Sequence, residues 1–116
     1  MQRLVFLNSK YVNFKDAKIH IEDRGLQFSD SIYEVIPFYG KKLIDLKFHL
    51  KRLKYSLKEL NIIFNFNTLN YNKIFKKLIN SNNKHYGLIY IQITRGVQSR
   101  DHAYKKNLKP NTIIYI

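Results

Sequence analysis

The sequence contains no cysteine and no tryptophan, and it has only two prolines and four glycines. Without cysteine the chain has no disulfide, no thiolate nucleophile and no cysteine ligand for a metal. The four histidines are scattered without a paired spacing, so we predict no metal site. No run approaches the roughly twenty apolar residues of a membrane span, and Met1 does not begin a signal-peptide pattern. We therefore expect a cytoplasmic protein without a membrane segment.

Acidic residues are also scarce, since 8 Asp and Glu stand against 21 Lys and Arg and give a formal net charge of +13. Such a charge favours association with nucleic acid or other anionic surfaces, so a basic module that binds nucleic acid or a protein partner is one hypothesis. Most of the basic residues, however, are lysines, seven of them on the faces of the two predicted helices, and no nucleic-acid recognition motif is visible. We interpret the charge as a solvated basic surface and argue against a nucleic-acid partner.

What is present is enough apolar material for one domain over residues 1–116, because 45% of the residues are hydrophobic. Two short apolar runs at residues 5–7 and 11–12 flank a polar turn and predict an opening hairpin. Residues 31–39 read as a strand, and the turn at residues 40–42 predicts a second hairpin that ends at residues 43–44.

Two helices follow these hairpins. Asp45 can cap the first, whose leucines step by four and three in the manner of a single buried stripe: Leu46, Leu50, Leu53, Leu57 and Leu60. Thr68 can cap the second, which carries five apolar residues on one face: Tyr71, Ile74, Phe75, Leu78 and Ile79.

The last predicted elements are strands. Residues 87–94 alternate between an apolar face and a polar face that includes Tyr90, Gln92 and Thr94. A loop over residues 95–110 leads to a final strand at residues 112–116, which we expect to present an unpaired edge. Together these elements predict an α+β fold in which an antiparallel sheet packs against about two helices.

Three blocks carry residues capable of chemistry. In the first, a charged loop with Asp23, Arg24 and Gly25 leads into the strand that bears Tyr33. Taken alone, Asp23 and Arg24 read as a surface ion pair, Gly25 as a turn, and Tyr33 as a half-buried strand aromatic. The second block places His49 and Arg52 on the leucine-striped helix, where Arg52 can bind a phosphate with two parallel hydrogen bonds or simply be solvated.

The third block runs from Tyr90 through a glycine-containing loop to Arg100 and His102. If the loop is extended, Arg100 and His102 point the same way and suit a carboxylate, with Asp101 facing solvent between them. A basic surface loop is the alternative for this block when it is considered by itself.

Taken in order, the three blocks resemble the class IV aminotransferases. The motifs are Asp23-Arg24-Gly25 with Phe28, Asp30 and Tyr33-Glu34-Val35, then His49 with Arg52-Leu53, then Thr94-Arg95-Gly96 with Arg100 and His102. The match covers nearly the whole chain, and the arginine-x-histidine pair is closest to the D-amino-acid transaminase branch. Branched-chain aminotransferases and aminodeoxychorismate lyases are the alternatives within the family.

The resemblance implies a role for each matching residue. Arg52 would bind the phosphate of pyridoxal phosphate with support from His49, and Tyr90 would lie close to the cofactor. Tyr33, Arg100 and His102 would bind the substrate carboxylate. In the family Tyr33 and the Arg100 loop come from different subunits, so this site implies a homodimer or a partner that contributes the C-terminal half.

The implied reaction transfers an amino group between a D-amino acid such as D-alanine and a 2-oxo acid. In the family the lysine that forms the Schiff base lies well beyond the equivalent of Ile116, in a C-terminal cofactor-binding domain that we expect to be absent from this chain. None of its lysines is predicted to be buried, so we identify no catalytic residue here and expect no transaminase activity from the chain alone. A non-catalytic homodimer or a regulatory partner of a full-length homologue is a further hypothesis.

One motif departs from the family pattern. The family has glycines around the aspartate of a Phe-Gly-Asp-Gly motif, whereas this chain has Phe28-Ser29-Asp30-Ser31. Because serine reaches positive φ less easily than glycine does, we expect a slightly altered turn.

Overall fold

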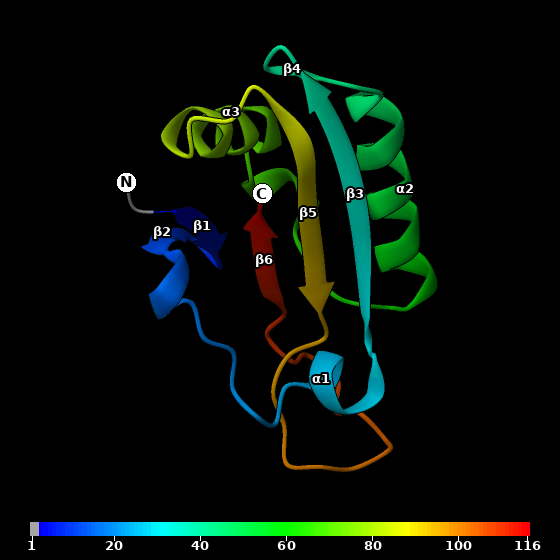
Figure 1. Ribbon diagram of the computed structural model, residues 1–116. Coiled ribbons are helices and arrows are strands. Elements are labelled where there is room, and N and C mark those ends of the chain that lie inside the picture. Colours follow the sequence, from blue (N-terminus) through cyan, green and yellow to red (C-terminus); the bar gives the residue numbers. More distant parts are fainter. Residues whose placement is uncertain (1–2) are drawn as a thin grey trace.

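Six antiparallel strands form one sheet in the computed structural model, which describes residues 3–116 (Figure 1). The strand order is β2-β1-β6-β5-β3-β4. In chain order the strands are β1 (Leu4–Leu7), β2 (Lys10–Asn13), β3 (Ser31–Tyr39), β4 (Lys42–Leu43), β5 (Tyr86–Thr94) and β6 (Asn111–Tyr115). The helices are α1 (Arg24–Phe28), α2 (Leu46–Glu59) and α3 (Tyr71–Ser81), with two single 3₁₀ turns, η1 (Phe14–Asp16) and η2 (Phe66–Thr68). The predicted α+β class is confirmed, and α1 is an additional short helix.

Both predicted hairpins are present. β1 and β2 pair around a turn in which Asn8 has φ +49°. β3 and β4 pair around Gly40 and Lys41, whose φ values are +56° and +64°. Two successive positive φ angles are characteristic of the two-residue turns that match the twist of hairpin strands. β4 pairs only with Phe38 and Tyr39, so α2 flanks the remaining length of β3 (Figure 1).

The prediction of an unpaired edge on the last strand is wrong. β6 lies inside the sheet, where it pairs with β5 along its whole length and with β1 at Phe6 and Leu7 (Figure 1). The edge strands are β2 and β4. The first and last strands of the chain are neighbours, and this pairing over more than a hundred residues leaves no trace in any local sequence pattern.

The two long helices lie where the sequence predicts them, but their caps differ. Asp45 occupies the N-cap of α2 in a left-handed conformation, with φ +53°, and its side chain makes no cap hydrogen bond. The N-cap of α3 is Asn70, whose side chain accepts from the backbone N–H of Lys73, whereas Thr68 ends η2. Leu60 lies just beyond α2 and is 40% exposed.

The core lies on one face of the sheet. Ile89, Ile91 and Ile93 of β5 are fully buried there with Leu53 of α2 and Phe75 of α3. All five predicted apolar residues of α3 are buried as well. The opposite face, which we call the outer sheet face, carries Tyr33, Val35, Pro37, Tyr39, Tyr86, Leu88, Tyr90, Gln92, Ile113 and Tyr115.

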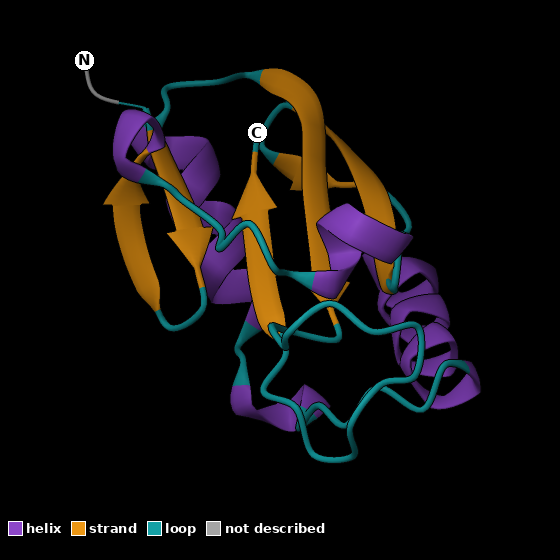
Figure 2. Cartoon of the chain, turned by 90° about the horizontal axis from the view of Figure 1, so that it is seen from below, coloured by secondary structure: helices purple, strands orange, loops and turns teal. Residues whose placement is uncertain are grey.

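α1 and the loop between β5 and β6 lie at the same end of the molecule (Figures 1 and 2). This end also holds the start of β3, so the charged loop of the first block and the Arg100 loop of the third block meet there.

Candidate functional site

Arg52 is tied to the sheet by a carboxylate. Its Nε and Nη2 donate to the two oxygens of Glu34 at 2.7 and 2.8 Å, and Nδ1 of His49 lies 2.7 Å from Glu34 Oε1. Glu34 belongs to the buried face of β3 and its side chain is only 4% exposed, whereas the side chain of Arg52 is 66% exposed. His49 and Arg52, three residues apart on α2, therefore converge on one buried carboxylate.

The pKa values reflect this arrangement. Burial raises the pKa of the Glu34 carboxyl, but the hydrogen bonds and charges of Arg52 and His49 outweigh burial, and its pKa is lowered overall. The hydrogen bonds and charge of Glu34 raise the pKa of Arg52, and the phenol of Tyr33 adds to that shift. Glu34 is thus ionised at neutral pH.

Tyr33 and Tyr90 stack on the outer sheet face. Their ring centroids are 5.9 Å apart with an interplanar angle of 23°, and Tyr33 is 61% exposed. The Tyr90 hydroxyl donates to Gln92 Oε1 at 2.8 Å, and Gln92 Nε2 donates to the Ser31 hydroxyl at 2.8 Å. This chain of hydrogen bonds fixes the orientation of Tyr90 and leaves the Tyr33 phenol facing solvent.

Arg100 and His102 share one neighbour. The Arg100 guanidinium lies 5.2 Å from the centre of the Phe28 ring, and the His102 ring lies 5.3 Å from it. Both residues are exposed, and Asp101 between them accepts from the backbone N–H of Ala103. Within residues 3–116, neither residue is hydrogen-bonded or stacked with Tyr33. The structure places Arg100 and His102 near the same Phe28 ring and, within one chain, does not join them to Tyr33.

A buried network holds that loop in place. Arg24 donates from Nε to Asp30 at 2.7 Å and from Nη1 and Nη2 to the carbonyls of Asp101 and His102 at 2.5 and 3.0 Å. Arg95 donates from Nε to the same Asp30 oxygen at 2.6 Å, and from its other nitrogens to the carbonyls of Leu60 and Asn61. Burial raises the pKa of Asp30, but the two arginines outweigh it and lower the pKa overall.

Asp23 and Gly25 are also structural. Asp23 is fully buried and accepts from Thr94, Asn111 and the backbone of Gly25. A Cβ atom on Gly25 would lie 2.5 Å from Thr94 Cγ2, so close packing explains the glycine. The reading of Asp23 and Arg24 as a surface ion pair is therefore wrong, because both are buried and Arg24 pairs with Asp30.

Sequence reasoning assigned no role to Glu34, although a pattern marks it. Its alternation partners Ile32 and Ile36 are buried core residues, so Glu34 is an acidic residue on the buried face of a strand. A buried carboxylate requires a cationic or hydrogen-bonding partner, and the adjacent helix offers His49 and Arg52.

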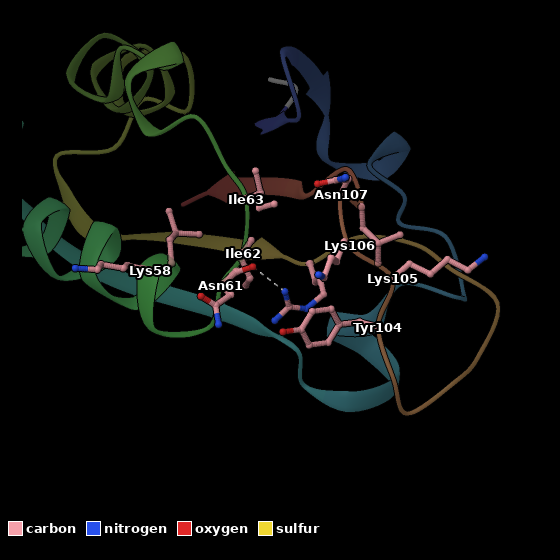
Figure 3. A pocket seen from close by; sticks show the side chains of 11 residues that line it. Lys58, Asn61, Ile62, Ile63, Tyr104, Lys105, Lys106 and Asn107 are labelled. Atoms are coloured by element: carbon pink, nitrogen blue, oxygen red, sulfur yellow. Dashed lines mark hydrogen bonds between the residues drawn. The ribbon is translucent and has the colours of Figure 1, made fainter.

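An open hollow of about 510 Å³ is lined by Asp45, Phe48, His49 and Arg52, and a smaller, more apolar one lies elsewhere. A cavity of about 460 Å³ lies between the end of α2 and the β5–β6 loop, and its lining includes Ile62, Ile63, Tyr104 and Lys105 (Figure 3). Arg95 also lines it, but its three guanidinium nitrogens are already bound to Asp30, Leu60 and Asn61. The cavity includes none of the six predicted site residues.

All sixteen lysines lie within the described residues, and all are exposed. None of them is buried in a site of the kind that activates a Schiff-base lysine. No helix in residues 3–116 has both the length and the hydropathy to cross a membrane.

Curated relatives match most of the chain. It is 40% identical over 100 residues to the D-alanine aminotransferase of Staphylococcus epidermidis, covering 86% of this chain and 36% of that protein. It is 35% identical over 112 residues to the D-alanine aminotransferase of Staphylococcus aureus, covering 96% of this chain and 40% of that protein. The chain thus spans less than half the length of these relatives.

Solved structures share the fold. The branched-chain amino acid aminotransferase from Escherichia coli matches with a TM-score of 0.85 at 21% identity, covering 99% of this chain and 40% of that one. A second branched-chain aminotransferase, solved with pyridoxamine 5′-phosphate, matches with a TM-score of 0.86 at 20% identity, covering 98% of this chain and 39% of that one. The 4-amino-4-deoxychorismate lyase of Pseudomonas aeruginosa matches with a TM-score of 0.76 at 22% identity, covering 96% of this chain and 38% of that one. At these identities the structures establish the fold.

The family itself is established by the match of a family model. The model described as amino-transferase class IV matches residues 31–116, which is most of the chain. Together with the curated relatives, this match places the chain in the class IV aminotransferases, a family that depends on pyridoxal phosphate.

Proposed function

We propose that this chain supplies the phosphate-binding and carboxylate-binding residues of a pyridoxal-phosphate-dependent D-amino-acid transaminase. The reaction transfers an amino group between a D-amino acid such as D-alanine and a 2-oxo acid. Similarity to relatives named D-alanine aminotransferase supports this substrate class over the branched-chain and aminodeoxychorismate alternatives, whose structures are near 20% identical.

The geometry of Arg52 is the observation that carries the proposal. Glu34 occupies Nε and one hydrogen of Nη2, which is one edge of the planar guanidinium. The second edge, formed by Nη1 and the other hydrogen of Nη2, keeps two parallel donors for an anion. Because the side chain is 66% exposed, this edge is accessible to the phosphate of pyridoxal phosphate or of its pyridoxamine form.

The carboxylate-binding residues would act from two directions. Tyr33 is 61% exposed on the outer sheet face. Arg100 and His102 both lie near the Phe28 ring on a loop held by Arg24, and a guanidinium and an imidazole N–H can each donate to an anion. We propose that a second copy, or a partner that completes the site, brings this loop to Tyr33.

Bound pyridoxal phosphate supplies the electron-withdrawing ring that stabilises charge at the amino acid Cα. The residues of this chain bind and orient: Arg52 at the phosphate, Tyr33, Arg100 and His102 at the substrate carboxylate, and Tyr90 beside the ring. The proton at Cα needs a base that the sixteen exposed lysines do not provide, so we propose that residues 1–116 act as one domain with a further polypeptide segment that carries the lysine.

Complementation tests this function. The chain would be produced together with the remainder of the Staphylococcus epidermidis D-alanine aminotransferase, and the purified complex assayed for pyruvate formation from D-alanine and 2-oxoglutarate. We expect activity that Arg52→Ala greatly reduces and that Lys51→Ala, an exposed neighbour on α2, leaves unchanged. A folded complex without activity, or with equal activity in Arg52→Ala, would refute the proposal.

A further inference from the structure

Glu34 lies next to two residues of the proposed site: it follows Tyr33 in the chain, and its side chain binds Arg52. It follows Tyr33 directly in β3, so the strand places the tyrosine on the outer face and the carboxylate on the buried face. From there the carboxylate reaches across the open side of β3 to α2 and accepts three hydrogen bonds or close polar contacts between 2.7 and 2.8 Å. Within residues 3–116, the hydrogen bonds of its side chain go to Arg52 and His49.

We infer that Glu34 is a positioning residue that selects the orientation of Arg52 for a phosphate ligand, with His49 fixing the carboxylate in turn. This inference rests on the proposed phosphate-binding function of Arg52. The contact to Nε and Nη2 turns that edge of the guanidinium toward the protein and the opposite edge toward solvent.

The physical reason is preorganisation. An exposed arginine has four flexible side-chain torsions, and ordering them when a ligand binds opposes binding. Here both donors of one edge are already bound to a carboxylate that is itself buried, so Arg52 is ordered before any ligand arrives. His49 prevents the carboxylate from rotating, because its Nδ1 lies 2.7 Å from Oε1 while Arg52 engages both oxygens.

The charge of Glu34 acts on phosphate binding in the direction opposite to its ordering of Arg52. Substitutions of Glu34 can therefore distinguish the two effects. The negative charge of Glu34 offsets the positive charge of Arg52 and, without positioning, would weaken the attraction for a phosphate. If charge alone mattered, Glu34→Gln would strengthen phosphate binding and Glu34→Asp, which keeps the charge on a shorter side chain, would change little. Positioning predicts that both substitutions weaken it, since neither preserves two acceptors at the correct reach.

The test compares pyridoxamine 5′-phosphate with pyridoxamine, which differ by the phosphate and carry no aldehyde to react with the sixteen exposed lysines. Calorimetric titration of the full chain gives the ratio of the two affinities. We expect Arg52→Ala to abolish the preference for the phosphate, and Glu34→Asp and Glu34→Gln each to reduce it about two- to tenfold, the effect of one lost preordered side chain. Glu59→Gln, an exposed glutamate at the end of α2, is the matched control and should have no effect.

A second measurement reports on Arg52 without a ligand. The Arg52 Nε–H resonance should be shifted and protected from solvent exchange in the unmodified chain, and should resemble a free arginine in both Glu34 variants. Unchanged phosphate preference and an unchanged Arg52 resonance in the Glu34 variants would overturn the positioning role while leaving the proposed function intact. No phosphate preference in the unmodified chain would instead refute the function of Arg52, and the positioning role would fail with it.

Discussion

Ser29 adopts a left-handed conformation, with φ +53°, at the end of α1. The sequence predicted a slightly altered turn where the family has glycine, and in this chain Ser29 takes a positive φ that serine tolerates poorly. This conformation costs a residue with a Cβ about 1–2 kcal/mol, whereas glycine adds an entropic penalty of about 0.5–1 kcal/mol.

Ser29→Gly should therefore raise the free energy of unfolding by about 0.5–1 kcal/mol, measured by urea denaturation. Ser31→Gly is the control. Ser31 lies in β3 and its hydroxyl accepts from Gln92, so its replacement should destabilise the chain. A loss of stability in Ser29→Gly would show that the left-handed turn is not strained.

Single residues were predicted unevenly, for a physical reason. The exposed residues Tyr33, Arg100 and His102 could be named from their chemistry and order in the chain, and their roles remain predictions. Glu34 was assigned no partner and Arg24 was paired wrongly with Asp23, because a carboxylate or guanidinium in the core acquires its role from segments that only the fold brings near. Arg24 bonds to carbonyls 77 and 78 residues away in the chain.

At the scale of elements, Arg24 links α1 to the β5–β6 loop. A lysine cannot replace its three hydrogen bonds to Asp30, Asp101 and His102. Arg24→Lys should lower the free energy of unfolding by about 3 kcal/mol, the usual effect of breaking a buried charged network. Amide hydrogen exchange should also accelerate in the loop around Arg100 more than in β5.

Arg100→Lys is the control for this substitution, because Arg100 is an exposed arginine of the same loop. Its effect on stability and on loop exchange should be small. Slow exchange in the loop of a folded Arg24→Lys variant would show that other contacts hold Arg100 and His102 in place.

The contact between β3 and α2 should make stability depend on pH in a defined direction. The pKa of Glu34 is lowered in the folded chain. The ionised carboxylate therefore contributes to the free energy of unfolding above the unfolded carboxyl pKa of about 4.3, and this contribution is lost as the pH falls through the folded pKa. Glu34→Gln should be less stable than the unmodified chain by about 1–3 kcal/mol at pH 5. Urea denaturation at pH 5 and pH 3 should show this difference narrowing in acid, and a constant difference would contradict the pKa assignment.

Elements whose pattern is local were predicted well. The two hairpins and the apolar stripe of α3 are confirmed, and so is that of α2 except for Leu60, which lies beyond the helix and is exposed, because turn residues and helical periodicity act within a few positions. The predictions of helix caps were less accurate. Thr68 was predicted to cap α3, but Asn70 can cap a helix equally well, and only the path of η2 decides between them. The position of β6 depended on β1, at the other end of the chain, and was missed.

For the molecule as a whole, the two faces of the sheet differ. α2 and α3 bury one face, whereas the outer sheet face leaves large side chains in solvent, including Tyr33, Tyr39, Tyr86 and Leu88. These four come from two adjacent strands, and Tyr39 pairs with Tyr86 across them. A contiguous apolar surface of this kind favours contact with another protein surface.

Concentrated solutions of the chain should therefore self-associate through the outer sheet face at physiological ionic strength, where salt screens the net charge of +13 beyond about 8 Å. Leu88→Lys should reduce the association measured by sedimentation velocity, because it places a charge at the centre of that face. Leu26→Lys is the matched control: Leu26 is 70% exposed on α1, away from the sheet, and its replacement adds the same charge. If both substitutions reduced association equally, the cause would be the added charge and not the outer sheet face. If the unmodified chain stayed monomeric at high concentration, the outer sheet face would not pair with itself.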